Sequence, residues 1–219
     1  TVKILKCPEV AKAALIGFPS IEDAGKCVTE IIAKGIIPAG MEIMDKALTK
    51  ATNDFSKAGY PMDAEAMMIV ELDGTESEVS ELIKRVEEIA KENKCSSVKT
   101  SKSDEERLKF WAGRKAAFPA CGDLAPDYMC MDGSIPRGKL AEVLREIQKL
   151  SVKYDLPVAN AFHAGDGNLH PLIMFDANDP DQLRRTEEFG AEILKYCVKV
   201  GGALTGEHGV GIEKRELMC

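Results

Sequence analysis

The stretch MMIVELDGTESEVSELIKRVEEIAKENKCSSVK, residues 67–99, carries the pattern that decides the fold. Its opening residues, Met67 to Leu72, are mostly apolar and suit a buried strand, and Asp73-Gly74 then provides a turn. Apolar side chains next recur at helical spacing, which predicts an amphipathic helix. They are Val79, Leu82, Ile83, Val86, Ile89 and Ala90. A short extended piece, Ser97 to Lys99, follows, so the stretch predicts a strand, a helix and a second strand.

The residues before this stretch show the same order of elements. An apolar run, Ala11 to Phe18, precedes a helical pattern over residues 21–32 that stops at Gly35, a natural helix end. An extended segment, Ile36 to Ile43, comes next. Residues 1–102 therefore show the strand-helix-strand-strand-helix-strand order of a ferredoxin-like unit.

A connecting helix over residues 103–118 separates this half from a second one. Ser103 and Glu106 are placed as a reciprocal cap at the start of that helix. Residues 128–219 then repeat the order of elements. The expected segments are Tyr128 to Ser134 extended, Arg137 to Tyr154 helical, Pro157 to His163 extended, His170 to Asp176 extended, Pro180 to Val200 helical and Gly201 to Leu204 extended. We therefore predict an α+β protein in which two ferredoxin-like halves form an antiparallel sheet with helices packed on it.

Composition excludes several classes of protein. Hydrophobic residues make up 45% of the 219 residues, enough to bury a core. The formal charge is −7 and no run of basic residues occurs, so nucleic acid is not an expected partner. The longest apolar stretches, such as Ala66 to Val70 and Val158 to Phe162, are too short to cross a bilayer, and no leader opens the chain. We expect a cytoplasmic protein without a transmembrane segment.

The cysteines form an odd set without a CxxC pair, which fits neither a disulfide framework nor a zinc knuckle. They are Cys7, Cys27, Cys95, Cys121, Cys130, Cys197 and Cys219. We expect reduced thiols with structural roles. The chain starts at Thr1 without a methionine, which is consistent with a fragment of a longer protein.

All three histidines lie in two glycine-rich segments, HAGDGNLH at 163–170 and GALTGEHGVG at 202–211. The first segment predicts a hairpin whose six turn residues place His163 directly opposite His170, close enough for both imidazoles to bind one ion. A solvated histidine pair on a sheet surface is the alternative. A catalytic metal usually takes three protein ligands, and Glu207 is the candidate for the third.

The second segment precedes an expected helix from Ile212 onward, so its amides are candidates to face an anion or an electron-rich ring. Neighbouring side chains in an extended segment point to opposite sides, so Glu207 could reach a metal while His208 reaches another group as a general base. A glycine-rich loop with surface charges is the alternative. No GxGxxG or GK[ST] sequence supports a phosphate loop.

These two motifs in order, with WAGRKAAFPA and YMCMDGSIPR upstream, resemble the C-terminal part of FAD-linked oxidases of the vanillyl-alcohol-oxidase-like superfamily. The resemblance covers nearly the whole chain and is nearest to the enzymes that oxidise glycolate and D-lactate. It implies a cap domain, residues 1–219, that lies over FAD held mainly by a separate N-terminal FAD-binding domain. Nothing in this chain resembles that domain, so the chain alone is expected to be an inactive fragment.

The resemblance also implies roles for particular residues. His163, His170 and Glu207 match ligands of a divalent metal, zinc or manganese, and His208 matches the base that takes the substrate's hydroxyl proton. Arg114 matches the arginine that binds the substrate carboxylate. Residues expected next to the flavin cofactor are Asn168, Gly206 and Glu207. The implied partners are a small 2-hydroxy acid, the FAD-binding domain, and other oxidase subunits or a second copy in a homodimer.

One departure concerns the substrate. Relatives that act on D-2-hydroxyglutarate carry threonine and lysine where this chain has Phe118 and Cys130, which favours a monocarboxylic acid. The function expected from sequence is therefore the substrate- and metal-binding domain of an FAD-dependent 2-hydroxy acid oxidoreductase. The alternatives are a non-catalytic regulatory or assembly module, or a subunit of a split flavoenzyme.

Overall fold

The computed structural model describes residues 7–218. The first half contains a four-stranded antiparallel unit with the order β4-β1-β3-β2. Its elements are β1 (Val10–Phe18), α1 (Ile21–Ala33), β2 (Gly40–Asp45), α2 (Lys46–Ser56), β3 (Ala66–Gly74), α3 (Glu76–Glu92) and β4 (Ser97–Thr100). Local sequence explains several of the helix boundaries: the Ser20 hydroxyl accepts the Asp23 amide at the start of α1, and Thr75 and Glu78 form a capping box on α3.

The second half repeats the arrangement, with β8 between β7 and β5. Its elements are β5 (Asp127–Cys130), β6 (Gly133–Ser134), α6 (Leu140–Tyr154), β7 (Val158–His163), β8 (Asn168–Phe175) and α7 (Pro180–Lys199). The last expected strand, Gly201 to Leu204, is reduced to one bridge between Ser134 and Ala203. The prediction of an α+β protein with two halves on one antiparallel sheet is confirmed.

The two halves are joined through the strands β2 and β7, which pair antiparallel. Glu42 lies opposite His163, Ile43 opposite Phe162, and Met44 opposite Ala161. This seam makes one eight-stranded sheet of the two halves.

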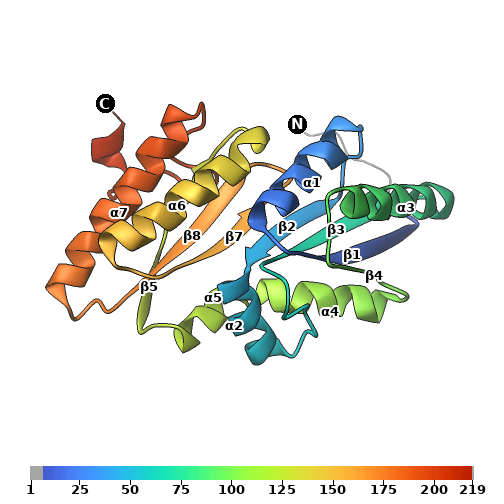
Figure 1. Cartoon of the computed structure of the whole chain (residues 1–219), viewed down its shortest axis with the longest axis horizontal. Coiled ribbons are helices and arrows are strands. Elements are labelled where there is room, and N and C mark those ends of the chain that lie inside the picture. Colours follow the sequence, from blue (N-terminus) through green and yellow to red (C-terminus); the bar gives the residue numbers. More distant parts are fainter. Residues whose placement is uncertain (1–6, 219) are drawn as a thin grey trace.

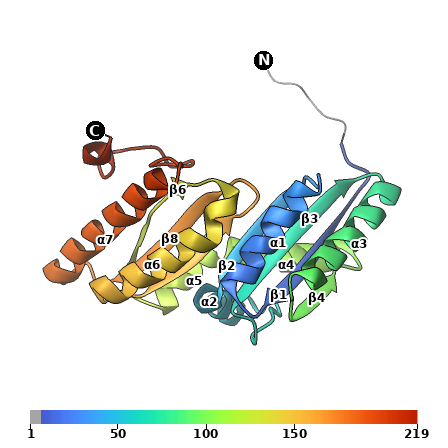
Figure 2. The ribbon, with the colours of Figure 1, turned by 45° about the horizontal axis from the view of Figure 1, so that its top comes forward.

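Helices cover both faces of this sheet (Figures 1 and 2). One face carries α1, α3, α6 and α7; the other carries α2, the connecting helix α4 (Asp104–Lys115) and the short α5 (Ala117–Ala120). A buried apolar cluster lies under each layer, because successive strand residues point to opposite faces. Ile43, Phe162 and Ile173 belong to the larger cluster, and Met44 and Leu172 belong to the smaller one beside α2 and α4.

The structure corrects some of the expected elements. Helix α2 was not predicted; the Asp45 side chain caps it by accepting the Leu48 amide. The connecting helix ends at Lys115 and not at residue 118, and the helix expected from Ile212 is a turn followed by a 3₁₀ turn, Arg215–Leu217. Among the described residues, no helix combines the length and the apolar character needed to span a membrane.

Candidate metal and substrate site

The two hairpin histidines lie close together, but they are not directly opposite each other. The turn uses only the residues 164–167, so β8 already begins at Asn168. His163 therefore pairs with Asn168, and His170 pairs with Ala161, which corrects the expected register. The imidazoles are diagonal neighbours on one face of the sheet, with ring centroids 5.0 Å apart and planes at 90°.

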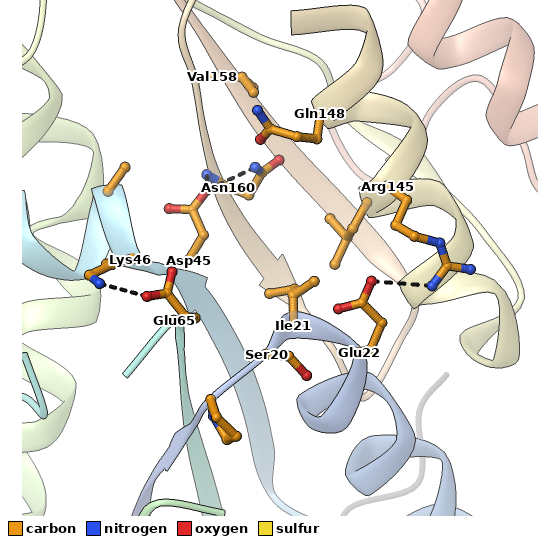
Figure 3. Close-up of a pocket in the computed structure, with 13 residues that line it drawn as sticks. Ser20, Ile21, Glu22, Asp45, Lys46, Glu65, Arg145, Gln148, Val158 and Asn160 are labelled. Atoms are coloured by element: carbon orange, nitrogen blue, oxygen red, sulfur yellow. Dashed lines mark hydrogen bonds and ion pairs between the residues drawn. The ribbon is translucent and has the colours of Figure 1, made fainter. Parts of the chain in front are cut away.

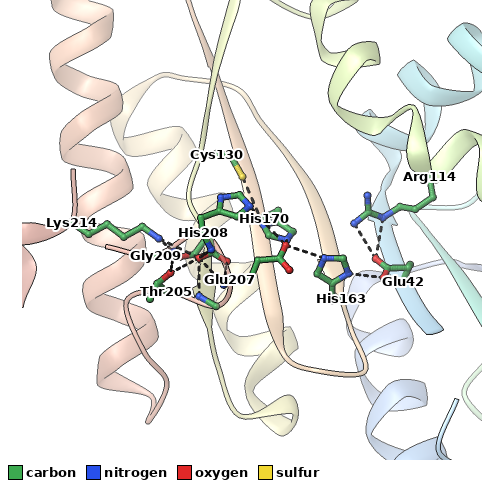
Figure 4. Close-up of polar contacts among 12 residues, drawn as sticks. Glu42, Arg114, Cys130, His163, His170, Thr205, Glu207, His208, Gly209 and Lys214 are labelled. Carbon is green, nitrogen blue, oxygen red and sulfur yellow. Dashed lines mark hydrogen bonds and ion pairs between the residues drawn. The ribbon is translucent and has the colours of Figure 1, made fainter. Parts of the chain in front are cut away.

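Glu207 lies against both imidazoles. Its Oε1 is 3.1 Å from His170 Nε2 and 3.4 Å from His163 Nε2. Ligand atoms around a tetrahedral zinc ion, each about 2.0–2.2 Å from the metal, lie about 3.3–3.5 Å from one another. Two neutral imidazoles and a carboxylate are also a usual donor set for such an ion. The three side chains thus fit a divalent metal (Figure 4).

The other ring nitrogen of each histidine faces a different group, which leaves Nε2 for the ion. His163 Nδ1 lies 2.6 Å from Glu42 Oε1, and His170 Nδ1 lies 3.7 Å from Cys130 Sγ. The hydrogen bond with Glu42 raises the pKa of His163, whereas burial and the neighbouring His163 lower the pKa of His170. A carboxylate behind a metal-binding histidine fixes the tautomer and the ring orientation.

Sequence reasoning missed Glu42, which connects His163 to Arg114. Arg114 donates from Nε to Glu42 Oε2 at 3.0 Å, and Nη2 is also 3.0 Å from that oxygen. Both residues are buried, with 8% of each exposed. The available signal was a single carboxylate at an interior position of the apolar strand β2. The structure brings Arg114 to the site, but as the ion-pair partner of Glu42.

The loop that carries Glu207 and His208 is held by Asp132, a second residue that sequence reasoning missed. The Asp132 carboxylate is fully buried and accepts the Thr205 hydroxyl at 2.6 Å. It also accepts the backbone amides of Gly206, Glu207 and His208 at 2.8, 3.1 and 3.0 Å. These amides are the ones expected to face an anion or an electron-rich ring; in the structure they donate to a carboxylate of the protein itself.

Burial alone would raise the pKa of Asp132, but the hydrogen bonds from Thr205 and the loop amides together hold it well below its usual range. Lys214 completes the arrangement. Its Nζ donates to the Asp132 carbonyl oxygen at 2.5 Å and lies 3.4 Å from Oδ2. The loop is therefore fixed from within the protein.

His208 lies on the same side of the loop as Glu207, which corrects the expectation that the two side chains point apart. The His208 ring stacks on that of His170, with centroids 5.0 Å apart and planes at 19°, and its Nε2 is 3.8 Å from Glu207 Oε1. His208 is half-exposed beside the proposed metal ligands. A base at this position could reach a group bound next to the ion.

The remaining predicted residues also lie at this end of the sheet. Asn168 is buried, and its Oδ1 has no hydrogen-bond partner among the described residues. A Cβ on Gly206 would lie 2.1 Å from that oxygen, so the loop can approach Asn168 only because residue 206 is glycine. The Phe118 ring lies 6.3 Å from that of His170, and burial raises the pKa of the Cys130 thiol to about 12.

A separate cleft of about 460 Å³ lies on the opposite face of the sheet, between α1 and α6 (Figure 3). Its polar side chains largely satisfy one another. Asn160 donates to Asp45, Arg145 pairs with Glu22, and Lys46 pairs with Glu65. None of the predicted site residues lines this cleft.

The fold and the site define an α+β domain that presents two histidines and a glutamate at the edge of a seam between two ferredoxin-like halves. The model of the family described as "FAD linked oxidases, C-terminal domain" matches residues 7–219, and the chain belongs to this family.

Curated relatives match all or nearly all of the chain. It is 54% identical over its full length to the glycolate oxidase subunit GlcD of Escherichia coli (strain K12), where the match covers 44% of the relative. Identity is 35% to the subunit GlcD of Bacillus subtilis (strain 168), over 96% of this chain and 45% of the relative. A probable mitochondrial D-lactate dehydrogenase of Danio rerio is 28% identical over all of this chain and 44% of its own length. The chain thus spans less than half the length of these relatives.

Solved structures share the fold at low sequence identity. A 4-ethylphenol oxidase from Gulosibacter chungangensis gives a TM-score of 0.67 at 11% identity, over 90% of this chain and 46% of its own. A p-cresol methylhydroxylase gives a TM-score of 0.66 at 15% identity, over 90% of this chain and 45% of its own.

Proposed function

We propose that this chain is the substrate- and metal-binding domain of an FAD-dependent 2-hydroxy acid oxidoreductase of the glycolate or D-lactate class. The observation that carries the proposal is the convergence of His163 Nε2, His170 Nε2 and Glu207 Oε1 on one point next to His208. Membership of the FAD-linked oxidase family and the glycolate oxidase relatives support the reaction class.

A divalent ion and FAD would supply two kinds of chemistry. The ion would lower the pKa of a bound hydroxyl, and the flavin would take up the electrons. The chain's own residues orient the substrate and move its proton. His208 accepts the hydroxyl proton at an imidazole nitrogen, since neutral imidazole is an efficient base near pH 7. Loss of the α-hydrogen as hydride, which the flavin would accept, would convert the 2-hydroxy acid into a 2-oxo acid.

Arg114 is the proposed partner of the substrate carboxylate. Glu42 already occupies its Nε and Nη2 side, so the other terminal nitrogen, Nη1, would receive the carboxylate. Holding the carboxylate in this way orients the α-hydrogen for transfer.

The surroundings of His170 favour a short monocarboxylic acid. Phe118 and Cys130 face this histidine, and neither carries a positive charge for a second carboxylate. Tyr128 adds a further aromatic ring 6.0 Å from that of Phe118. A dicarboxylic substrate would have to bury its second charge against apolar groups, which is unfavourable.

The test uses the complete reading frame that encodes this chain. Glycolate and D-lactate should bleach the flavin absorbance of the purified protein under anaerobic conditions, and His208→Asn should abolish bleaching while flavin content stays unchanged. The double variant His163→Ala/His170→Ala should lose bound metal in elemental analysis. Unchanged bleaching in His208→Asn would remove that residue as the base, and unchanged metal content would refute the ligand assignment.

A further inference from the structure

A second group of ligand atoms shares one histidine with the site described above. Cys130, His170 and His208 each offer one atom, and these atoms lie within 4.8 Å of one another. Cys130 ends β5, His170 lies on the neighbouring strand β8, and the Asp132-bound loop carries His208. Figure 4 shows Cys130 on the side of His170 away from His163.

The distances in this group suit a metal that binds sulfur. Cys130 Sγ lies 3.7 Å from His170 Nδ1. A tetrahedral ion with a metal–sulfur bond of about 2.3 Å and a metal–nitrogen bond of about 2.0–2.1 Å separates the two atoms by about 3.6 Å. The stacked His208 ring, 5.0 Å from the His170 ring, supplies the second nitrogen.

The two groups carry the same charge but differ in softness. Each offers two neutral imidazoles and one anionic ligand, a carboxylate from Glu207 in one group and a thiolate from Cys130 in the other. Carboxylates favour hard ions such as Mn²⁺, whereas thiolates favour soft ions. A neutral imidazole has a single free lone pair, so His170 can serve only one of the two groups at a time.

We propose that Cys130, His170 and His208 form a second metal site, which takes a thiophilic ion such as Cd²⁺ or Zn²⁺ and excludes an ion from the His163, His170 and Glu207 site. Binding forms the metal–sulfur bond and releases the thiol proton to solvent, with no change of oxidation state. A further consequence rests on the proposed function: a metal ion bound to His208 uses the nitrogen lone pair that would otherwise accept the substrate proton. Soft ions would then inhibit the enzyme at the site itself.

The experiment titrates the metal-free chain with Cd²⁺ and, separately, with Mn²⁺. Sulfur-to-cadmium charge transfer absorbs in the ultraviolet and reports only thiolate ligation, while calorimetry measures both ions. The background carries Cys7→Ser and Cys219→Ser, because Cys7 is an exposed thiol and Cys219 lies outside the described residues. Cys95→Ser, which removes a half-buried thiol elsewhere in the fold, is the matched control.

We expect the cadmium band to saturate at one ion per chain and to disappear in Cys130→Ser, with Cd²⁺ binding weakened at least about tenfold and Mn²⁺ binding unchanged. Glu207→Gln should keep the band and weaken Mn²⁺ binding, and Cys95→Ser should change neither. A band that survives Cys130→Ser overturns the proposal, as does an equal loss of both ions in Glu207→Gln. A cadmium band in a chain that never binds Mn²⁺ would support the second site and count against the metal assignment in the proposed function.

Discussion

Replacement of Asp132 should destabilise the chain and loosen the loop that carries Glu207 and His208. The carboxylate accepts one hydroxyl and three amides from residues 205–208, and it lies beside the ammonium of Lys214, which is 4% exposed. A hydrogen bond to a charged group contributes about 1.5–3 kcal/mol, and leaving a buried ion without its partner costs about 3–5 kcal/mol. These contributions are not additive.

We therefore expect Asp132→Ala to lower the free energy of unfolding by about 3–5 kcal/mol, because the buried ammonium of Lys214 loses its carboxylate. The loss is not larger, because Lys214 still donates to the backbone carbonyl of residue 132 and the loop amides can form hydrogen bonds with water. Asp132→Asn should cost about 1–2 kcal/mol, because one amide oxygen can still accept from the loop. Urea denaturation followed by circular dichroism measures both. In the same variants, Mn²⁺ binding should weaken while the secondary structure of the two halves stays intact. A loss below about 1 kcal/mol for Asp132→Ala would refute the reasoning.

The pH dependence of the free energy of unfolding provides a second test of the role of Asp132. The pKa of Asp132 is lowered in the folded state, so its stabilisation is fully present above the unfolded pKa of about 3.9 and is lost as the pH falls. At pH 3 the loss should be about 1.3 kcal/mol relative to pH 7. The stability difference between wild type and Asp132→Asn should shrink by that amount. A constant difference down to pH 3 would contradict the assignment.

Three further predictions concern Glu42, Gly206 and Asp45. Glu42→Gln should weaken Mn²⁺ binding by about 10–100-fold in calorimetry, because the carboxylate that orients His163 is lost; unchanged affinity would show that Glu42 only pairs with Arg114. Gly206→Ala should also weaken Mn²⁺ binding, since the added Cβ would meet Asn168, whereas the control Gly138→Ala, with nothing within 4 Å of its Cβ, should not. Desolvation raises the pKa of Asp45 to about 6. In denaturation titrations, the stability of the wild type relative to Asp45→Asn should therefore fall as the pH rises from about 4 to about 6. A stability difference that stays constant over this range would contradict the raised pKa.

Much of the fold follows from local patterns. Helix α4 begins after Ser103, whose side chain accepts the Glu106 amide at the position that the sequence predicts, and the apolar residues of α3 recur at helical spacing. Helix α2 was missed although Asp45 can cap it and Leu48, Ala51 and Phe55 recur at helical spacing. Its sequence KALTKATNDFS also contains threonine, asparagine and aspartate, which are poor helix formers. Packing of Leu48 in the smaller core stabilises that helix instead, and Ala51 on the same helix is also buried.

The candidate site was predictable only in part, for reasons of distance along the chain. His163, His170 and Glu207 lie in two motifs that can be recognised directly, and the structure brings them together. Their register depends on how many residues the turn uses, and composition did not show that only the residues 164–167 form it. Glu42 lies 121 residues from His163, and only the pairing of β2 with β7 makes them neighbours.

That pairing makes the site depend on the folding of both halves. The seam contains three residue pairs, and the pair at one end joins Glu42 of the first half to His163 of the second. A metal that binds His163 in this orientation therefore favours the docked state of the halves over a state in which they have separated, by linkage. Without a bound ion, the pairing of β2 with β7 should open more readily. Hydrogen exchange of the β2 and β7 amides should then be faster than with the ion bound, so it would report whether the site is occupied.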